Sequence, residues 1–144
     1  MENLHYLLMK SNAMLSRRIL SEVSRLGLTP GQPKVLDFLL QYNEADQKTI
    51  AAYCEIEQTT VGSILLRMEN AGLVRRRQKD GNRRSLYVSL TPAGKEKAEK
   101  LMDIFLENEN TATVNLSETE IETLKELLAK LCGTMQSQAK EKKV

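Results

Sequence analysis

The sequence is poor in the residues that build disulfide frameworks, metal sites and aromatic cores. Its 144 residues include no tryptophan, two phenylalanines, four tyrosines, two cysteines and one histidine. Leucine, isoleucine, valine and methionine must therefore supply the core, which favours packed helices over a large β-sandwich. Cys54 and Cys132 make neither a disulfide framework nor a metal-ligand spacing. We accordingly expect a reducing, cytoplasmic location, and neither a metal nor a cofactor.

Long apolar runs and catalytic motifs are also absent. No stretch approaches the roughly 20 apolar residues that a membrane span needs. The start of the chain, MENLHYLLMKSNAML, lacks the pattern of a secretory signal. There is no glycine-rich phosphate loop and no nucleophile motif, and His5 stands alone. The sequence therefore predicts a protein that neither spans a membrane nor acts as an enzyme.

Positive charge is concentrated in one segment. The whole chain has a formal net charge of +2, whereas the window 67–84 contains seven basic and two acidic residues. A basic segment in a nearly neutral protein is typical of contact with a polyanion, although a solvated basic hairpin would have the same composition. The basic residues of this window are Arg67, Arg75, Arg76, Arg77, Lys79, Arg83 and Arg84.

Apolar residues recur at helical spacing over most of the chain. An amphipathic helix is predicted from about Glu2 to Arg25, ended by Gly27. Thr29 and Pro30 predict the N-cap and first position of a second helix. A short helix near 48–53 and a helix over 58–70 follow. The last of these is expected to bury Val61, Ile64, Leu65 and Met68.

The spacing then changes to that of a β-hairpin. Two runs, 73–78 and 85–90, contain β-branched and aromatic residues, and the turn-forming letters KDGN separate them. Because side chains alternate along a strand, Arg75 and Arg77 share one face and Arg76 lies on the other. At least one of these faces is thus well placed for phosphate, and the other for pairs within the protein.

Two further helices complete the pattern. Thr91 and Pro92 open a long helix that runs to about Glu109, where polar residues at 108–111 are expected to break it. The letters SETE at 117–120 form a capping box for a last, leucine-rich helix.

Two short helices joined by a tight turn and followed by a hairpin are the parts of a winged helix-turn-helix. The expected fold is mainly α, with a small β-hairpin wing and long N- and C-terminal helices. Residues 29–91 are predicted to form a DNA-binding domain, residues 1–28 and 92–136 a helical dimerisation region, and residues 137–144 a flexible tail.

In this arrangement the helix over 58–70 would enter the major groove of double-stranded DNA, which accepts one α-helix. Gly62 would allow close approach, and Arg67 would contact a phosphate. The hairpin tip would insert arginine into the minor groove. The predicted DNA-binding residues are Gln58, Thr59, Thr60, Ser63, Arg67, Arg75, Arg77, Arg83 and Arg84. Each of the helix residues taken singly could equally be a solvent-facing polar residue of an ordinary helix, without contact to DNA.

Three stretches resemble the MarR family of bacterial transcription regulators: LGLTPGQPKVLDFL (26–39), QTTVGSILLRMENAGLVRRR (58–77) and GNRRSLYVSLTPAGK (81–95). The resemblance implies a homodimer with interlocked terminal helices, base contacts from the helix at 58–63, and minor-groove insertion of Arg84. Asn82 stands where the family commonly has an aspartate, and Ser63 where it often has a basic residue.

The resemblance also implies a small-molecule effector bound between the dimer helices and the winged domain. The candidate lining residues, chosen by helical position, are His5, Met9, Met14, Leu36, Phe38 and Tyr42. Methionine and aromatic residues at such spacing more often belong to a core than to a pocket.

The leucine stripe of the last helix supports pairing on physical grounds. Burial of one leucine is worth ~1.5–3 kcal/mol, so a wet stripe would be costly. The alternative is a monomer whose terminal helices pack back on their own domain. The function predicted is thus a homodimeric, sequence-specific regulator, acting as a repressor on a pseudo-palindromic operator.

Two alternatives remain at this level. One is a redox-responsive regulator acting through Cys54, although Glu55 and Glu57 would raise the pKa of its thiol. The other is a helical protein-interaction module without DNA binding.

Overall fold

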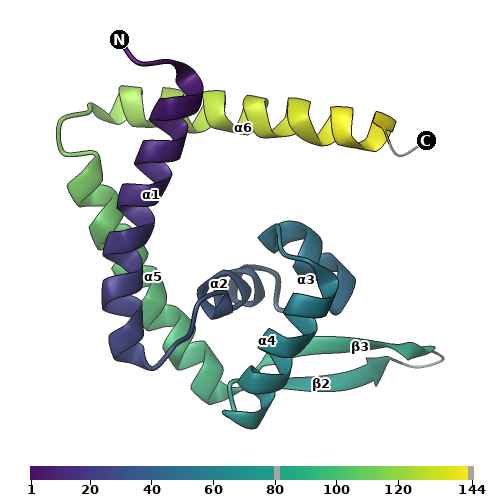
Figure 1. Cartoon of the computed structure of the whole chain (residues 1–144). Coiled ribbons are helices and arrows are strands. Elements are labelled where there is room, and N and C mark those ends of the chain that lie inside the picture. The colour runs from purple at the N-terminus through teal and green to yellow at the C-terminus, as the bar shows by residue number, and fades with distance from the viewer. Residues whose placement is uncertain (80–81, 143–144) are drawn as a thin grey trace. The chain divides into compact units, whose positions relative to one another are not determined.

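The computed structural model describes residues 1–79 and 82–142, the side chains of residues 82–85 excepted. The chain divides into two compact units, Met1–Asn108 and Glu109–Val144. Its elements, in order, are α1 (Leu4–Val23), the 3-10 helix η1 (Ser24–Leu26), α2 (Gln32–Tyr42), β1 (Glu44–Asp46), α3 (Gln47–Cys54), α4 (Gln58–Asn70), β2 (Val74–Lys79), β3 (Asn82–Leu90), α5 (Pro92–Ala112) and α6 (Glu118–Lys142) (Figure 1). This order confirms the predicted winged helix-turn-helix fold.

The core of the first unit forms around α2. Val35, Leu36, Phe38 and Leu39 are buried there, because the 3.6-residue period places them on the faces that meet the neighbouring elements. The inward-facing set predicted for α4 is confirmed as buried. The other members of the core are Val23, Leu28, Ala45, Ile50, Ala51, Cys54, Val61, Ile64, Leu65, Met68, Leu73, Val74, Val88, Ala98 and Leu101.

The sheet has three strands, where the sequence predicted two. Its order is β1-β3-β2, and both pairings are antiparallel. β1 pairs Glu44 with Ser89 and Ala45 with Val88. The sequence prediction missed this strand because Glu-Ala-Asp has low strand propensity and becomes extended only by pairing with β3.

The start of α2 differs from the prediction. Thr29 and Pro30 belong to a turn, closed by the Gln32 N–H donating to the Thr29 carbonyl at 3.2 Å, and the helix begins at Gln32. Gly31 precedes it with a φ of 92°, and a Cβ there would lie 2.7 Å from Cδ1 of Ile64. Proline still enters the first turn of the helix, but the residue is Pro33.

The ends of the last two helices also extend beyond their predicted limits. α5 continues through the polar residues 108–111 to Ala112. Within it Asn108 is 1% exposed and accepts from Nε of Arg18 in α1 at 3.3 Å, so this residue supports the helix instead of breaking it. The predicted capping box of α6 is confirmed, since the Ser117 N–H donates to Glu120 Oε1 at 2.9 Å. The residues expected to form a flexible tail are helical as far as Lys142.

Among the described residues, no helix combines the length and apolar character needed to cross the hydrocarbon core of a membrane.

The hairpin joins α5 at a tight backbone junction. The Thr91 N–H donates to the Leu73 carbonyl at 3.0 Å, and Thr91 Oγ1 donates to the Gly72 carbonyl at 2.6 Å. The same hydroxyl accepts from the Gly94 N–H at 3.0 Å, so Thr91 caps α5 as predicted. A Cβ on Gly94 would lie 1.9 Å from the Leu73 carbonyl oxygen. The Leu-Thr-Pro-Ala-Gly motif is therefore the sequence that this junction requires.

We expect Gly94→Ala to lower the free energy of unfolding by roughly 2 kcal/mol or more, because the clashing atom is backbone and cannot rotate away. Gly133→Ala is the matched control: nothing lies within 4 Å of its added Cβ, and it sits inside a helix. That change should raise stability by about 0.5–1 kcal/mol. Urea unfolding at fixed protein concentration measures both free energies. Equal changes in the two variants would contradict the claim that Gly94 is required for the contact with the Leu73 backbone.

Candidate nucleic-acid interface

The outer face of α4 carries the side chains predicted to contact DNA. All five of them are exposed: Gln58, Thr59, Thr60, Ser63 and Arg67. Among the described residues, the side chain of Arg67 has no ion-pair partner. The opposite face of the helix is buried, so α4 is held against the core while its polar face stays accessible. This is the geometry that a helix entering a major groove needs.

Helix α3 fixes the first turn of α4 in place. The Gln47 Nε2 donates to the carbonyl of Gln58 at 2.9 Å. α3 is itself capped by Asp46, whose side chain accepts from the Thr49 N–H at 2.8 Å. Hydrogen bonds from Thr49 hold the pKa of Asp46 below its usual value, so the carboxylate that caps α3 stays ionised. The two helices therefore present their N-termini as one connected unit.

Gly62 has a packing role within the protein that the sequence prediction did not include. A Cβ at this position would lie 3.0 Å from Nε2 of Gln47, so the glycine accommodates the side chain of α3. Gly62 lies between the exposed and the buried residues of α4, on the side where α3 packs. Close approach of this part of α4 to DNA stays a prediction.

The hairpin has two faces of different character. Register pairs Arg75 with Ser89, and Arg77 with Tyr87, so these four side chains share the outer face. Arg76 pairs with Val88, which is buried, and so belongs to the inner face. The predicted alternation of the three arginines is confirmed.

A carboxylate holds the middle of the outer face. Arg77 donates from Nε to Glu44 Oε2 at 3.0 Å and from Nη2 to Glu44 Oε1 at 2.8 Å. Nζ of Lys79 lies 3.9 Å from the same carboxylate and 4.2 Å from the ring centre of Tyr87. Arg77 was predicted as a phosphate contact, but here it makes a two-point ion pair with β1. The sequence prediction missed Glu44 because its strand was missed.

The inner face also uses one of its arginines within the protein. Nε of Arg76 lies 3.6 Å from Oε2 of Glu69 in α4, an ion pair too long for a hydrogen bond. Its Nε and Nη2 atoms are buried and have no hydrogen-bond partner within the described part of the chain. Both faces of β2 thus place an arginine against a carboxylate, where only one face was expected to do so.

The remaining hairpin arginines fall into two groups. Arg75 is exposed and lies at the base of the hairpin, away from the tip, where it lines a cavity of about 420 Å³. Arg83 and Arg84 belong to β3, but their side chains lie outside the described residues.

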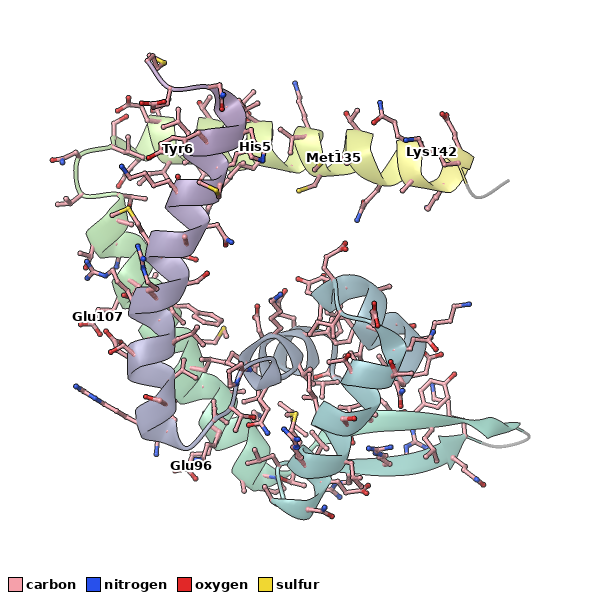
Figure 2. All side chains as sticks on the ribbon, viewed as in Figure 1. His5, Tyr6, Glu96, Glu107, Met135 and Lys142 are labelled. Carbon is pink, nitrogen blue, oxygen red and sulfur yellow. The ribbon has the colours of Figure 1, made fainter. Side chains whose placement is uncertain are left out.

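The six residues predicted to line an effector pocket do not form one cluster within the chain, although the rings of Phe38 and Tyr42 are in contact. Leu36 and Phe38 belong to the buried core. His5, Met9 and Met14 are exposed on α1, and Figure 2 shows His5 near the N-terminal end of that helix, away from α2. None of the six lines the cavity at the hairpin base. Helical position alone could not separate core from pocket.

An aromatic cluster covers the end of α2. The ring centres of Phe38 and Tyr42 lie 4.9 Å apart, and those of Phe38 and Tyr53 lie 4.8 Å apart. Burial, with added effects of Tyr42 and Asp37, raises the pKa of Tyr53. Tyr42 therefore belongs to a local cluster that joins α2 to α3.

Cysteine chemistry gains no support from the geometry. Cys54 is 4% exposed, and burial raises the pKa of its thiol. The thiol is therefore protonated at neutral pH and shielded from oxidants, which argues against the redox alternative. Cys132 is exposed on α6.

Comparisons with known proteins agree with this geometry. Residues 28–86 match the model of the MarR family. The chain carries a MarR-family domain. No curated protein matches the chain in sequence.

Solved structures extend the likeness beyond the MarR-family domain. A probable transcriptional regulator from Pseudomonas aeruginosa is 28% identical, with a TM-score of 0.78 over 90% of this chain and 97% of that one. MepR from S. aureus, solved in complex with DNA, is 24% identical, with a TM-score of 0.82 over 93% of this chain and 99% of that one. NadR, solved in complex with 4-hydroxyphenylacetate, is 23% identical, with a TM-score of 0.80 over 91% of this chain and 93% of that one. Family and fold together indicate a winged helix transcription regulator.

We expect Glu44→Gln to strengthen binding to duplex DNA of random sequence, because it releases Arg77 and Lys79 from their shared counter-ion. The slope of log affinity against log salt should steepen by about 0.9 for each of these two cations that gains a phosphate contact. Stability should fall by less than about 1 kcal/mol, since the pair is partly exposed.

Glu99→Gln makes the same charge change on the exposed side of α5 and serves as the control. Fluorescence anisotropy over a salt series gives both slopes. If the salt slope of Glu44→Gln is no steeper than that of Glu99→Gln, then the ion pairs of Glu44 do not keep Arg77 and Lys79 from contacting DNA.

Proposed function

We propose that the protein is a sequence-specific DNA-binding transcription regulator that acts as a homodimer. The observation that carries this proposal is the exposed polar face of α4, held by a buried opposite face and followed directly by a basic hairpin. A helix N-terminus with hydroxyl and amide side chains suits base edges and phosphates alike. The S. aureus relative, solved as a DNA complex, has the same fold and supports this assignment.

Within this proposal the side chains divide by task. Gln58, Thr59, Thr60 and Ser63 contact base edges in the major groove, and Arg67 contacts a phosphate. Arg84 inserts into the minor groove from the tip of the wing, beside Arg83. Arg75 and Arg77 are the remaining phosphate candidates, Arg77 only after exchange of its carboxylate partner.

Self-association is supported by apolar surface that the chain leaves uncovered. α6 buries none of its described residues, and Leu124, Leu127 and Leu128 are all exposed. The first two line a shallow groove of about 360 Å³ together with Leu116. α1 likewise exposes Leu4, Leu7 and three other large apolar side chains, Met9, Met14 and Leu20. Leucine burial at ~1.5–3 kcal/mol each would favour a second copy of the chain on these faces.

A symmetric dimer implies a pseudo-palindromic operator. Its two α4 helices would enter successive major grooves about 34–36 Å apart, one helical turn of DNA. Occupancy of such a site within a promoter would repress transcription by excluding polymerase. A small-molecule effector would release the dimer from DNA. The complex of NadR with 4-hydroxyphenylacetate supports the part of this proposal that concerns a small ligand, since that protein has the same fold.

We expect Arg67→Gln to weaken binding to all duplex sequences alike and to reduce the salt slope by about 0.9, as the loss of one phosphate contact requires. Ser63→Ala should instead change which sequences are selected, with the salt slope unchanged. Arg25→Gln, an exposed arginine on η1, is the charge-matched control for Arg67→Gln.

Anisotropy titrations over a salt series and selection from a random DNA library separate these effects. If Arg67→Gln behaves like Arg25→Gln, α4 does not face the DNA. If the parent protein retards no duplex, the alternative of a protein-interaction module without DNA binding takes its place.

We expect Leu127→Lys to shift the protein from dimer to monomer. A lysine in the proposed dimer interface buries less apolar area than leucine and places an unpaired charge there. Ser137→Lys, also on the exposed surface of α6, is the control and should remain dimeric. Sedimentation velocity over a concentration series measures both. A Leu127→Lys variant that remains a dimer would place the interface elsewhere.

A further inference from the structure

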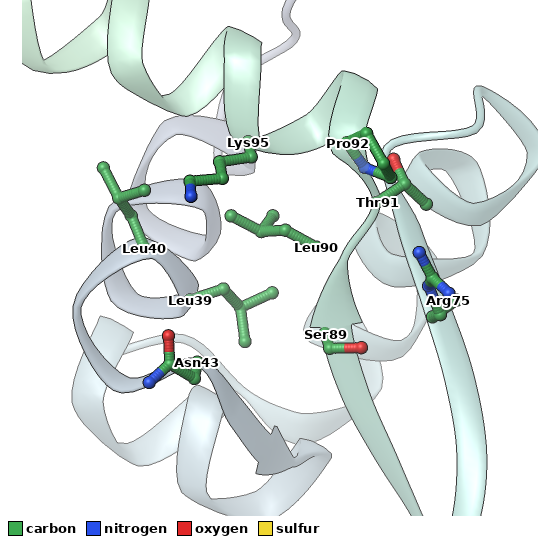
Figure 3. Close-up of a pocket in the computed structure, with 9 residues that line it drawn as sticks. All are labelled: Leu39, Leu40, Asn43, Arg75, Ser89, Leu90, Thr91, Pro92 and Lys95. Carbon is green, nitrogen blue, oxygen red and sulfur yellow. The ribbon is translucent and has the colours of Figure 1, made fainter.

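The cavity at the hairpin base is built from four elements that the fold brings together: α2, β2, β3 and α5. α2 and the residue after it contribute Leu39, Leu40 and Asn43, and the start of α5 contributes Pro92 and Lys95. The other lining residues, Arg75, Ser89, Leu90 and Thr91, come from the strands and the junction (Figure 3). The cavity volume of about 420 Å³ lies within the range of small-molecule sites.

The lining combines an apolar floor with two cations and no acidic residue. Figure 3 shows Leu39 and Leu90 at the centre, with Lys95 on one side of them and Arg75 on the other. Among the described residues, neither of these two cationic side chains has an ion-pair partner. Every other described arginine of the hairpin faces a carboxylate, so the absence of a counter-ion at Arg75 is specific to this place.

We propose that this cavity binds a small dianion with an apolar body and an anionic group at each end, of which a short-chain dicarboxylate is the simplest example. The cations lie on opposite sides of the leucine floor, so one carboxylate of the ligand pairs with Lys95 and the other with Arg75. A monoanion leaves one of them without a partner. Charge-assisted hydrogen bonds to carboxylate are the strong kind, and arginine makes them at two points.

The position of the cavity connects it to the DNA interface, and this step rests on the proposed function. Ser89 pairs in register with Arg75 on one side and with Glu44 on the other, so the cavity lies next to the carboxylate that holds Arg77. A bound dianion neutralises both cations and lowers the positive potential at the base of the wing. Occupancy therefore weakens DNA binding.

Binding is tested first without DNA, on the full-length protein by calorimetry. The probes are suberate, whose flexible chain adapts to the separation of the cations, and 8-hydroxyoctanoate, which has one carboxylate on the same chain. We expect suberate to bind about tenfold tighter, equal to ~1.4 kcal/mol for the second pair. Arg75→Gln and Lys95→Gln should each remove that difference, while Arg25→Gln keeps it. Backbone amide signals of Ser89, Leu90 and Lys95 should shift on titration.

Equal affinity of the two probes, or a difference that survives both substitutions, overturns the proposal. If suberate does not bind and both variants weaken DNA binding, the two cations contact phosphate and the cavity is not a ligand site. Resistance of Arg75→Gln and Lys95→Gln to denaturant, compared with the parent, shows that lost binding is not lost folding.

The DNA consequence has its own measurement. The affinity for operator DNA is measured with and without saturating suberate. The parent is compared with the Arg75→Gln, Lys95→Gln double variant, and this comparison corrects for the ionic strength that suberate adds. We expect a loss of affinity of at least about fivefold in the parent alone. Suberate binding with unchanged DNA affinity overturns this regulatory step. If the parent retards no DNA, the proposed function fails, and the calorimetric comparison still decides the cavity.

Discussion

The missing side chain at Gly94 lets the backbone of α5 begin in contact with the backbone of Leu73. A Cβ there would overlap the Leu73 carbonyl oxygen, which also accepts from the Thr91 N–H. Leu73 follows α4 and precedes β2, so this contact fixes where the hairpin begins after α4. The wing and the cavity at its base take their positions from this junction, which lies directly after the end of α4.

Charge along the hairpin is arranged by strand register. Side chains two residues apart on a strand share a face and lie about 6.6 Å apart along it. On the outer face this gives Arg75 at the base and Arg77 in the middle. Lys79 follows a register irregularity, yet its Nζ still lies 3.9 Å from the Glu44 carboxylate. Register places Glu44 in the same cross-strand row as Ser89 and Arg75, but its carboxylate pairs with Arg77 and lies near Lys79 instead. The direction taken by this one side chain of the edge strand therefore decides which of the described basic residues have a counter-ion.

The helices and the hairpin could be predicted because their signals are local. The apolar period of α4, the hydroxyl cap at Thr91 and the capping box at Ser117 each lie within a few residues of the element they specify. What could not be predicted depends on partners far along the chain. Glu44 meets Arg77 only through β3. Asn108 bonds the Ile104 carbonyl of its own helix, and its remaining side-chain partners, Arg18 and Glu22, belong to α1.

The same distinction explains the site. Exposure of the α4 residues followed from helical period, whereas the roles of Gly62 and of the hairpin arginines depended on packing between elements. A hairpin with seven basic residues in or near it would, from composition alone, present all of them to a polyanion. The structure instead holds Arg76 and Arg77 on carboxylates and leaves Arg75 beside an apolar cavity. Net charge thus overstates the surface offered to DNA. Among the hairpin arginines whose side chains are described, Arg75 is the one without an ion-pair partner, and its surroundings suit a small ligand.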